Sequence, residues 1–179
     1  MRLINTMLKA AAIRSKNYSD NWETPAELYK AVIPKILPVP ADIWEPFIGC
    51  TNLSTKTLQS LGHNVFETNT DFFDTEWPHE NGQPRVLLSN PPFSQKFKVL
   101  ERLLIENKPF LLLVPAWVYA SATFRNMVKK HDRHDVQLVV PPMRVHYVDP
   151  ETHLQRKGTA FDSVFIASGV YNGKQLIFV

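Results

Sequence analysis

The stretch Arg-Val-Leu-Leu-Ser-Asn-Pro-Pro-Phe, residues 85–93, decides how the rest of the chain is interpreted. Its first five residues contain the apolar run Val86-Leu87-Leu88, which is typical of a strand buried on both faces of a sheet. Asn90 and the two prolines end that strand, and a helix is predicted to begin near Ser94. In an open α/β sheet, the residues that follow a central strand project into the crevice where ligands bind. Asn90, Pro91, Pro92 and Phe93 are therefore the first candidates for a functional site.

Strands and helices alternate on both sides of this stretch. The alternation predicts an α/β fold with an open, mostly parallel, doubly wound sheet. A C-terminal antiparallel hairpin and a final edge strand are expected to complete it. The predicted strands are 42–45, 63–67, 85–89, 110–114 and 136–140, the hairpin pairs 144–148 with 161–167, and the edge strand is 175–179. Helices are predicted from Pro25 (with Thr24 and Glu27 as a capping box), over 52–61, from the cap Ser94, and over 119–130.

Length and composition limit the class of protein. At 179 residues the chain suits one domain over residues 21–179, preceded by a basic helical arm at 1–20. The net charge of +3 does not by itself indicate a polyanionic partner, so that case depends on how the basic residues cluster. One cysteine, Cys50, cannot form an intrachain disulfide, which makes a reducing, cytoplasmic setting the expectation. No apolar run approaches the roughly 20 residues that cross a bilayer, so no membrane partner is expected.

The residues Asn90-Pro91-Pro92-Phe93 have a specific chemical use. The Asn90 side-chain oxygen and the Pro91 backbone carbonyl can each accept one hydrogen from an exocyclic amine. These bonds would localise the nitrogen lone pair, otherwise delocalised into a ring, and aim it at a sulfonium methyl group. The prolines fix the backbone, and Phe93 would stack on a flipped base. The alternative is a strand-ending turn with Phe93 packed in the core.

With this motif, the chain resembles the amino-methyltransferases, in particular the small adenine-N6 enzymes of phages and other mobile elements. Their hallmark is Asn/Asp-Pro-Pro-aromatic, and the resemblance covers most of the chain, from Trp22 to about Ala167. It implies a single Rossmann-like methyltransferase domain, S-adenosylmethionine as cofactor, and DNA or RNA as partner. Related cap-adenosine RNA enzymes also use Asn-Pro-Pro-Phe, so the resemblance leaves DNA and RNA both open.

The segment after the first predicted strand is the candidate cofactor turn. By similarity, Glu45 would bind the cofactor's cationic amino group, while Phe47 and Gly49 would shape the wall beside its methionine tail. Family analogy places Thr24 and Pro25 against the same tail. The alternative for Glu45 is a strand-end carboxylate bonded to nearby backbone.

Acidic residues further along complete the expected cofactor pocket. Glu67, in preference to Asn69, is the candidate for the ribose hydroxyls because it ends the second strand. Asp71 and Phe72 resemble the family's adenine-recognition segment, although a capping aspartate followed by a core phenylalanine explains them nearly as well. Thr51 stands where many relatives have a second glycine, which raises the question of whether it crowds the cofactor.

Basic and aromatic residues late in the chain are the candidates for substrate binding. A polyanion would be attracted to such a cluster, and the loop at 149–158 lies between predicted strands. The substrate-binding candidates are Arg144, His146, Arg156 and Lys157. No histidine shows metal-ligand spacing with cysteine or carboxylate, so no metal is expected.

Three functions remain compatible with these residues. The first is methylation of adenine N6 in DNA or RNA. The second is methylation of a glutamine amide or cytosine N4, which uses the same amine chemistry. The third is a catalytically degenerate nucleic-acid-binding module, a possibility raised by Thr51. Nothing in the pattern decides the oligomeric state.

Overall fold

The computed structural model describes residues 22–149, 152, 154–155, 161–171 and 175–179. The predicted arm at 1–20 lies outside the described residues. The helices are α2 (Ala26–Ile36), α3 (Leu53–Ser60), α4 (Lys96–Glu106), α5 (Trp117–Ala120) and α6 (Ala122–Lys130). The strands are β1 (Asp42–Glu45), β2 (Asn64–Glu67), β3 (His79–Glu80), β4 (Gln83–Pro84), β5 (Val86–Ser89), β6 (Phe110–Pro115), β7 (Gln137–Val140), β8 (Ser163–Ser168) and β9 (Leu176–Phe178).

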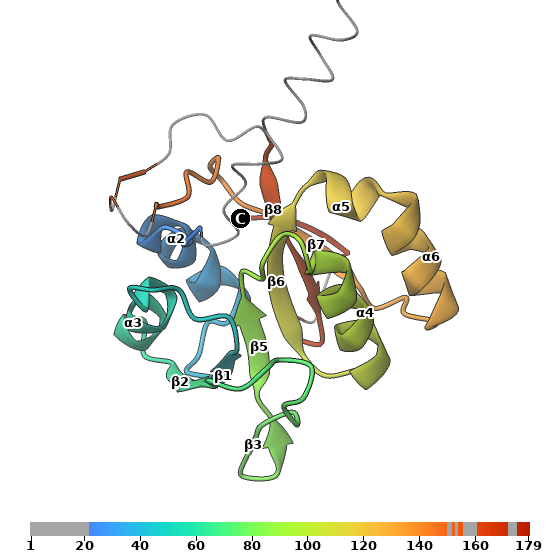
Figure 1. The fold of residues 1–179 in the computed structure, drawn as a ribbon, viewed down its shortest axis with the longest axis horizontal. Helices are drawn as coiled ribbons and strands as arrows, with labels where there is room; N and C mark the ends of the chain where they lie inside the picture. Colours follow the sequence, from blue (N-terminus) through green and yellow to red (C-terminus); the bar gives the residue numbers. More distant parts are fainter. Residues whose placement is uncertain (1–21, 150–151, 153, 156–160, 172–174) are drawn as a thin grey trace, which may run out of the picture.

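Seven strands form one sheet in the order β2-β1-β5-β6-β8-β7-β9 (Figure 1). The first four in this order are parallel to one another, and β8 runs antiparallel to both of its neighbours. The edge strand β9 pairs in parallel with β7. The predicted α/β class, the mostly parallel sheet and its antiparallel C-terminal part are therefore confirmed. This topology is Rossmann-like.

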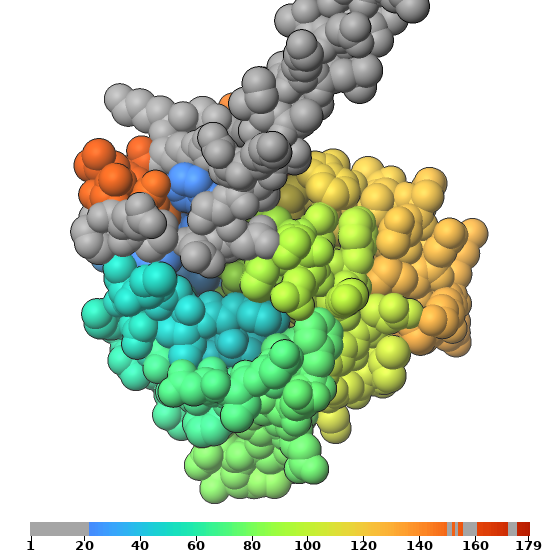
Figure 2. Space-filling view, in the orientation of Figure 1, coloured from blue at the N-terminus to red at the C-terminus, as the bar shows by residue number. Residues whose placement is uncertain are grey.

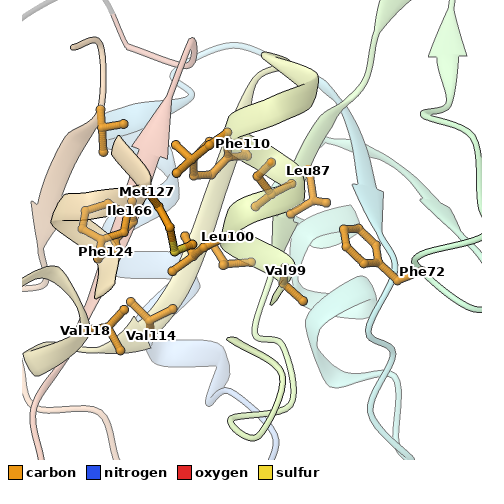
Figure 3. Packing of buried hydrophobic residues seen from close by; sticks show 14 of the residues in the cluster. Phe72, Leu87, Val99, Leu100, Phe110, Val114, Val118, Phe124, Met127 and Ile166 are labelled. Atoms are coloured by element: carbon orange, nitrogen blue, oxygen red, sulfur yellow. The ribbon is translucent and has the colours of Figure 1, made fainter. Parts of the chain in front are cut away.

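Helices cover both faces of the sheet, and the alternation of side chains along each strand decides which helix a residue meets. In β6, Phe110, Leu112 and Val114 pack with residues of α4, α5 and α6. Figure 3 shows this side of the core. Leu111 and Leu113 point to the opposite face, where α2 and α3 pack. All six residues of β6 are buried, which explains the continuous apolar run that predicted this strand.

The predicted pairing of 144–148 with 161–167 is wrong. Residues 144–148 form no strand, and only Val148 makes isolated bridges, to Glu23 and Gln155. β8 instead lies between β6 and β7. All six residues of β8 are buried, so this strand needs a neighbour on each side and helices on both faces.

Several helix ends also differ from the sequence predictions. α2 begins at Ala26 with Pro25 as its N-cap, and no side chain caps it, so the predicted capping box is wrong. Thr24 lies one residue too far from the helix to reach the amides of the first turn. α4 begins at Lys96 without a side-chain cap, so Ser94 is not its cap. The predicted helix 119–130 is divided, because Ser121 is extended and its Oγ accepts from the Phe124 amide to start α6.

Candidate active site

A cavity of about 400 Å³ lies at the carboxyl ends of β1, β2 and β5. β1 continues into α3 on one face of the sheet, whereas β5 continues into α4 on the other face. Such a reversal between neighbouring strands opens a crevice, and it is where ligands bind in α/β sheets. The cavity lining is Trp22, Glu23, Thr24, Tyr29, Glu45, Pro46, Phe47, Ile48, Gly49, Cys50, Leu53, Ser54, Thr68, Asn69, Thr70, Asn90 and Pro92.

Asn90 presents an acceptor without a partner to this cavity. Its Nδ2 donates to the Trp22 carbonyl oxygen at 3.0 Å, and this bond fixes which way the amide faces because a carbonyl only accepts. Its Oδ1 is buried and has no hydrogen-bond partner among the described residues. A buried acceptor that makes no hydrogen bond costs on the order of 1–3 kcal/mol of stability. The site therefore has a built-in place for a ligand N–H or O–H.

Glu45 ends β1 beside Asn90's strand and is almost fully buried. Its Oε1 accepts from the Ser89 hydroxyl, at the end of β5, and from the Phe47 amide at 3.2 Å. Burial raises the pKa of Glu45 from 4.5 to about 8, although the bonds from Ser89, Phe47 and Ser54 act in the opposite direction. At neutral pH the free protein therefore holds this carboxyl largely protonated, and a cation placed beside it would favour the charged form.

Glu23 holds the turn that follows β1. Its two carboxylate oxygens accept from the Thr51 amide at 2.7 Å and from the Thr51 hydroxyl at 2.5 Å. Its backbone pairs with Val148 on the other side. A Cβ added at Gly49 would lie 2.3 Å from Glu23 Oε1, so the close approach of this carboxylate is what requires glycine at position 49. Glu23 thus joins the entry to α2 with the cofactor turn predicted from the sequence.

Six of the twelve residues predicted for catalysis or cofactor binding line the cavity directly. These are Thr24, Glu45, Phe47, Gly49, Asn90 and Pro92. Pro25 and Pro91 are buried beside lining residues. Glu67 pairs in register with Glu45 on the neighbouring strand, and its Oε1 is buried without a partner among the described residues. Asn69, the second choice for the ribose, lines the cavity where Glu67 does not.

Asp71 and Phe72 are not among the residues that line the cavity. The Asp71 carboxylate accepts from the Phe73 amide at 2.8 Å, which is a local turn bond. Phe72 is buried, and its ring centroid lies 5.0 Å from that of the lining residue Phe47. Arg102 of α4 bonds the Phe72 carbonyl and stacks 4.4 Å from its ring centroid. These contacts make Phe72 a support for Phe47 in this conformation.

Phe93 packs into the core on the α2 side of the sheet. Its ring centroid lies 5.6 Å from that of Tyr147 and 5.5 Å from that of Phe161, both in edge-to-face geometry. Its side chain is 6% exposed, so this ring belongs to the hydrophobic core here. For a base to stack on Phe93, the ring would have to leave these two aromatic contacts.

The predicted substrate residues are only partly described. Arg144 is exposed and pairs with Asp162 at 3.3 Å. His146 is half-buried, and its Nδ1 has no partner among the described residues. Arg156 and Lys157 lie outside the described residues.

Sequence reasoning missed several residues of the cavity wall. Trp22 and Glu23 precede the helix that was expected to contribute only Thr24 and Pro25, while Ser54 and Thr68 follow the two strands that were considered. In the described part of the chain, no group of three or more His, Cys, Asp or Glu residues is arranged to hold a metal ion. None of the described helices has the length and apolar character needed to cross a membrane.

The chain is similar in fold to a number of solved structures, and two of them are described next. The chain is similar to a candidate class I S-adenosylmethionine-dependent methyltransferase from Listeria monocytogenes, with a TM-score of 0.49 and 15% identity over 96% of this chain and 70% of that chain. It is also similar to a candidate methyltransferase from Thermoplasma acidophilum, with a TM-score of 0.40 and 12% identity over 78% of this chain and 72% of that chain. No protein-family model and no curated protein matches the sequence. At these levels neither likeness decides what this chain does.

Proposed function

We propose that this chain is an S-adenosylmethionine-dependent methyltransferase that modifies an exocyclic amino group, namely N6 of adenine in a nucleic acid. The observation that carries the proposal is the buried, unpartnered Oδ1 of Asn90 in the wall of a cavity at the carboxyl ends of the strands. An acceptor in that position suits a ligand that brings an N–H donor.

Asn90 and Pro91 would act on the amine. In the proposed role, Asn90 Oδ1 accepts one amine hydrogen and the Pro91 carbonyl accepts the other. Both bonds turn the nitrogen lone pair away from the ring and toward the methyl donor. The contact between Asn90 Nδ2 and the Trp22 carbonyl keeps the acceptor aimed before the substrate arrives. The fold therefore positions the Asn90 acceptor before the substrate binds, and such positioning increases the rate of the chemical step.

The residues of the cavity fit the proposed cofactor. Its volume falls in the range of small-molecule sites, and its lining combines two carboxyl groups, several hydroxyl and amide groups and three aromatic side chains. When bound, S-adenosylmethionine supplies a methyl group on a sulfonium sulfur, which becomes a thioether after transfer. Glu45 would bind its ammonium group, with Thr24, Pro25, Phe47 and Gly49 around the methionine tail. Glu67 or Asn69 would meet the ribose, and Asp71 and Phe72 the adenine.

The choice of adenine in a nucleic acid rests on the Asn-Pro-Pro-Phe motif and on the basic residues late in the sequence. Arg144 and His146, with Arg156 and Lys157 further along the chain, would meet phosphates. A glutamine amide or cytosine N4 uses the same acceptors, so both belong in the test as competing substrates.

The test is transfer of labelled methyl from S-adenosylmethionine to separate pools of DNA, RNA and protein, followed by nucleoside and amino-acid analysis. We expect label in N6-methyladenine. Asn90→Ala should reduce the rate on the order of 100-fold, because it removes a positioned acceptor. The matched control is Asn64→Ala, an exposed asparagine at the amino end of β2 whose Nδ2 bonds Asp42.

Each alternative gives a different result. Full activity of Asn90→Ala would overturn the site assignment even if label were transferred. Label confined to cytosine or to protein would replace adenine by that substrate. A protein that transfers no label and shows no thermal shift with S-adenosylhomocysteine would support the non-catalytic binding module.

A further inference from the structure

An exposed aromatic residue lies at the same edge of the sheet as the Asn-Pro-Pro-Phe motif. Trp117 is the first residue of α5 and follows β6, the parallel neighbour of β5, after one intervening residue. Its side chain is 49% exposed, whereas the next residue, Val118, is fully buried. In Figure 1, α5 follows the upper end of β6 and lies above α4. Trp44 and Trp77 are core residues, so the exposure of Trp117 is not general for tryptophan in this fold.

Two residues of α4 hold Trp117 in place. The ring centroids of Phe97 and Trp117 lie 6.1 Å apart in edge-to-face geometry. The Lys96 ammonium lies 5.0 Å from the Trp117 ring centroid and 5.2 Å from that of Phe97. Together Lys96, Phe97 and Trp117 form what is called here the aromatic platform. In Figure 2, α4, α5 and α6 form one continuous surface.

The aromatic platform is joined to the proposed amine site by a hydrogen bond. Lys96 Nζ donates to the Phe93 carbonyl oxygen at 2.6 Å, so the lysine contacts the last residue of the motif and the tryptophan ring at once. A base that stacks on Trp117 would therefore be a near neighbour of an adenine held by Asn90. Neighbouring strands of a sheet are separated by only about 5 Å.

A second basic residue, Arg144, is connected to the platform through Asp162. The Ala116 amide, next to Trp117, donates to the Asp162 carbonyl oxygen at 2.8 Å. The Asp162 side chain in turn pairs with Arg144 at 3.3 Å. Lys96 thus brings positive charge close to an exposed aromatic ring, which is the combination that binds a base and its phosphate in single-stranded nucleic acids.

We propose that Trp117, with Lys96 beside it, stacks on an unpaired nucleobase that flanks the target adenine. The inference rests on the proposed function, because the flanking base is positioned by the target adenine bound at the amine site. An unpaired base offers a free ring face, whereas the bases of a duplex already stack on each other. The chain should therefore prefer single strands or unpaired regions to a continuous duplex, in DNA and RNA alike.

The test measures binding without catalysis. Fluorescence anisotropy would be followed with labelled oligothymidine, oligouridine, an adenine-containing single strand and a duplex of the same length. Thymine and uracil carry no exocyclic amine, so the first two probes report the platform independently of the amine site. Trp117→Ala should weaken binding of every single strand roughly 10- to 100-fold, while Trp117→Phe keeps most of the affinity because it keeps a ring. Ile105→Ala, an exposed residue of the same helix α4 as Lys96, is the control.

The outcomes separate this inference from the proposed function. Unchanged single-strand binding by Trp117→Ala, or an equal loss for duplex and single strand, would overturn the platform even if methyl transfer were observed. Conversely, a selective loss of single-strand binding would support the platform even if no methyl transfer were detected. Circular dichroism and thermal unfolding of Trp117→Ala establish that the variant is folded, and Lys96→Gln provides a second variant that should lower both affinity and its salt dependence.

Discussion

Replacing Glu45 by glutamine tests the electrostatics of the cavity in the free protein. The Glu45 carboxyl is buried at the junction of β1 and β5, where Ser89 and Phe47 donate to it. Burial raises its pKa from 4.5 to about 8. Glutamine has the same shape, keeps an oxygen that accepts from both donors, and does not ionise. The substitution therefore removes the titration of this group with little change in packing.

The raised pKa of Glu45 determines how folding stability changes with pH. The unfolded chain releases this proton above about pH 4.5, whereas the folded protein holds it until about pH 8, so folding stability is lost as the pH rises through this window. Each tenfold difference in proton affinity is worth about 1.4 kcal/mol. The wild-type carboxyl thus lowers the free energy of unfolding by about 3 kcal/mol at about pH 7, an amount that glutamine does not incur.

The measurement is urea unfolding, followed by circular dichroism, at about pH 5 and about pH 7.5. We expect the stability advantage of Glu45→Gln over the wild type to grow by about 3 kcal/mol between these pH values. The contributions of the other titrating groups cancel in this difference because both proteins carry those groups. Glu76→Gln, at an exposed position, is the control for the substitution itself. An advantage that stays constant with pH would show that Glu45 is already ionised in the folded protein, and would refute the reasoning.

Two further predictions concern the turn after β1. Gly49→Ala should lower the free energy of unfolding by about 2–4 kcal/mol, because its Cβ would displace the Glu23 carboxylate from Thr51; adding Glu23→Ala should return part of the loss in urea unfolding. Cys50 is exposed and lines the cavity, so S-adenosylhomocysteine at about ten times its dissociation constant should slow alkylation by iodoacetamide about tenfold. Wild-type stability of Gly49→Ala, or unprotected Cys50, would contradict these contacts.

The central part of the fold was predictable because its sequence pattern is strong. The apolar runs at 86–89 and 110–115 become neighbouring buried strands, and each is followed by a helix that returns along the sheet. In the sheet, β5 pairs in parallel with β1, so the carboxyl ends of these two strands meet. Asn90 and Glu45 were therefore brought to one cavity by reasoning about strand ends, without knowledge of any contact between them.

Short sequence signals at two turns account for other differences between the predicted and the observed elements. Asn81-Gly82 is a favoured two-residue hairpin turn, both residues have positive φ, and they connect β3 to β4. Ser121 is a typical N-cap and divides the predicted helix at 119–130 into α5 and α6. The position of β8 between β6 and β7 has no such local signal. Pairing among the last strands depends on which edge of the sheet remains open, and no short sequence pattern indicates that edge.

The hydrogen bonds of Glu23 could not be predicted from the sequence because the partners are 28 residues apart. They bear directly on Thr51, the position at which the resemblance to amino-methyltransferases leads us to expect a glycine. A glycine is needed in a turn where φ is positive, yet the residue with positive φ here is Asn52, at 54°, and not Thr51. Asparagine tolerates that conformation. Threonine also adds a hydroxyl that satisfies the second oxygen of Glu23, which a glycine would leave without this donor. Thr51 therefore fits this turn without a positive φ, and its amide and hydroxyl both hold the Glu23 carboxylate.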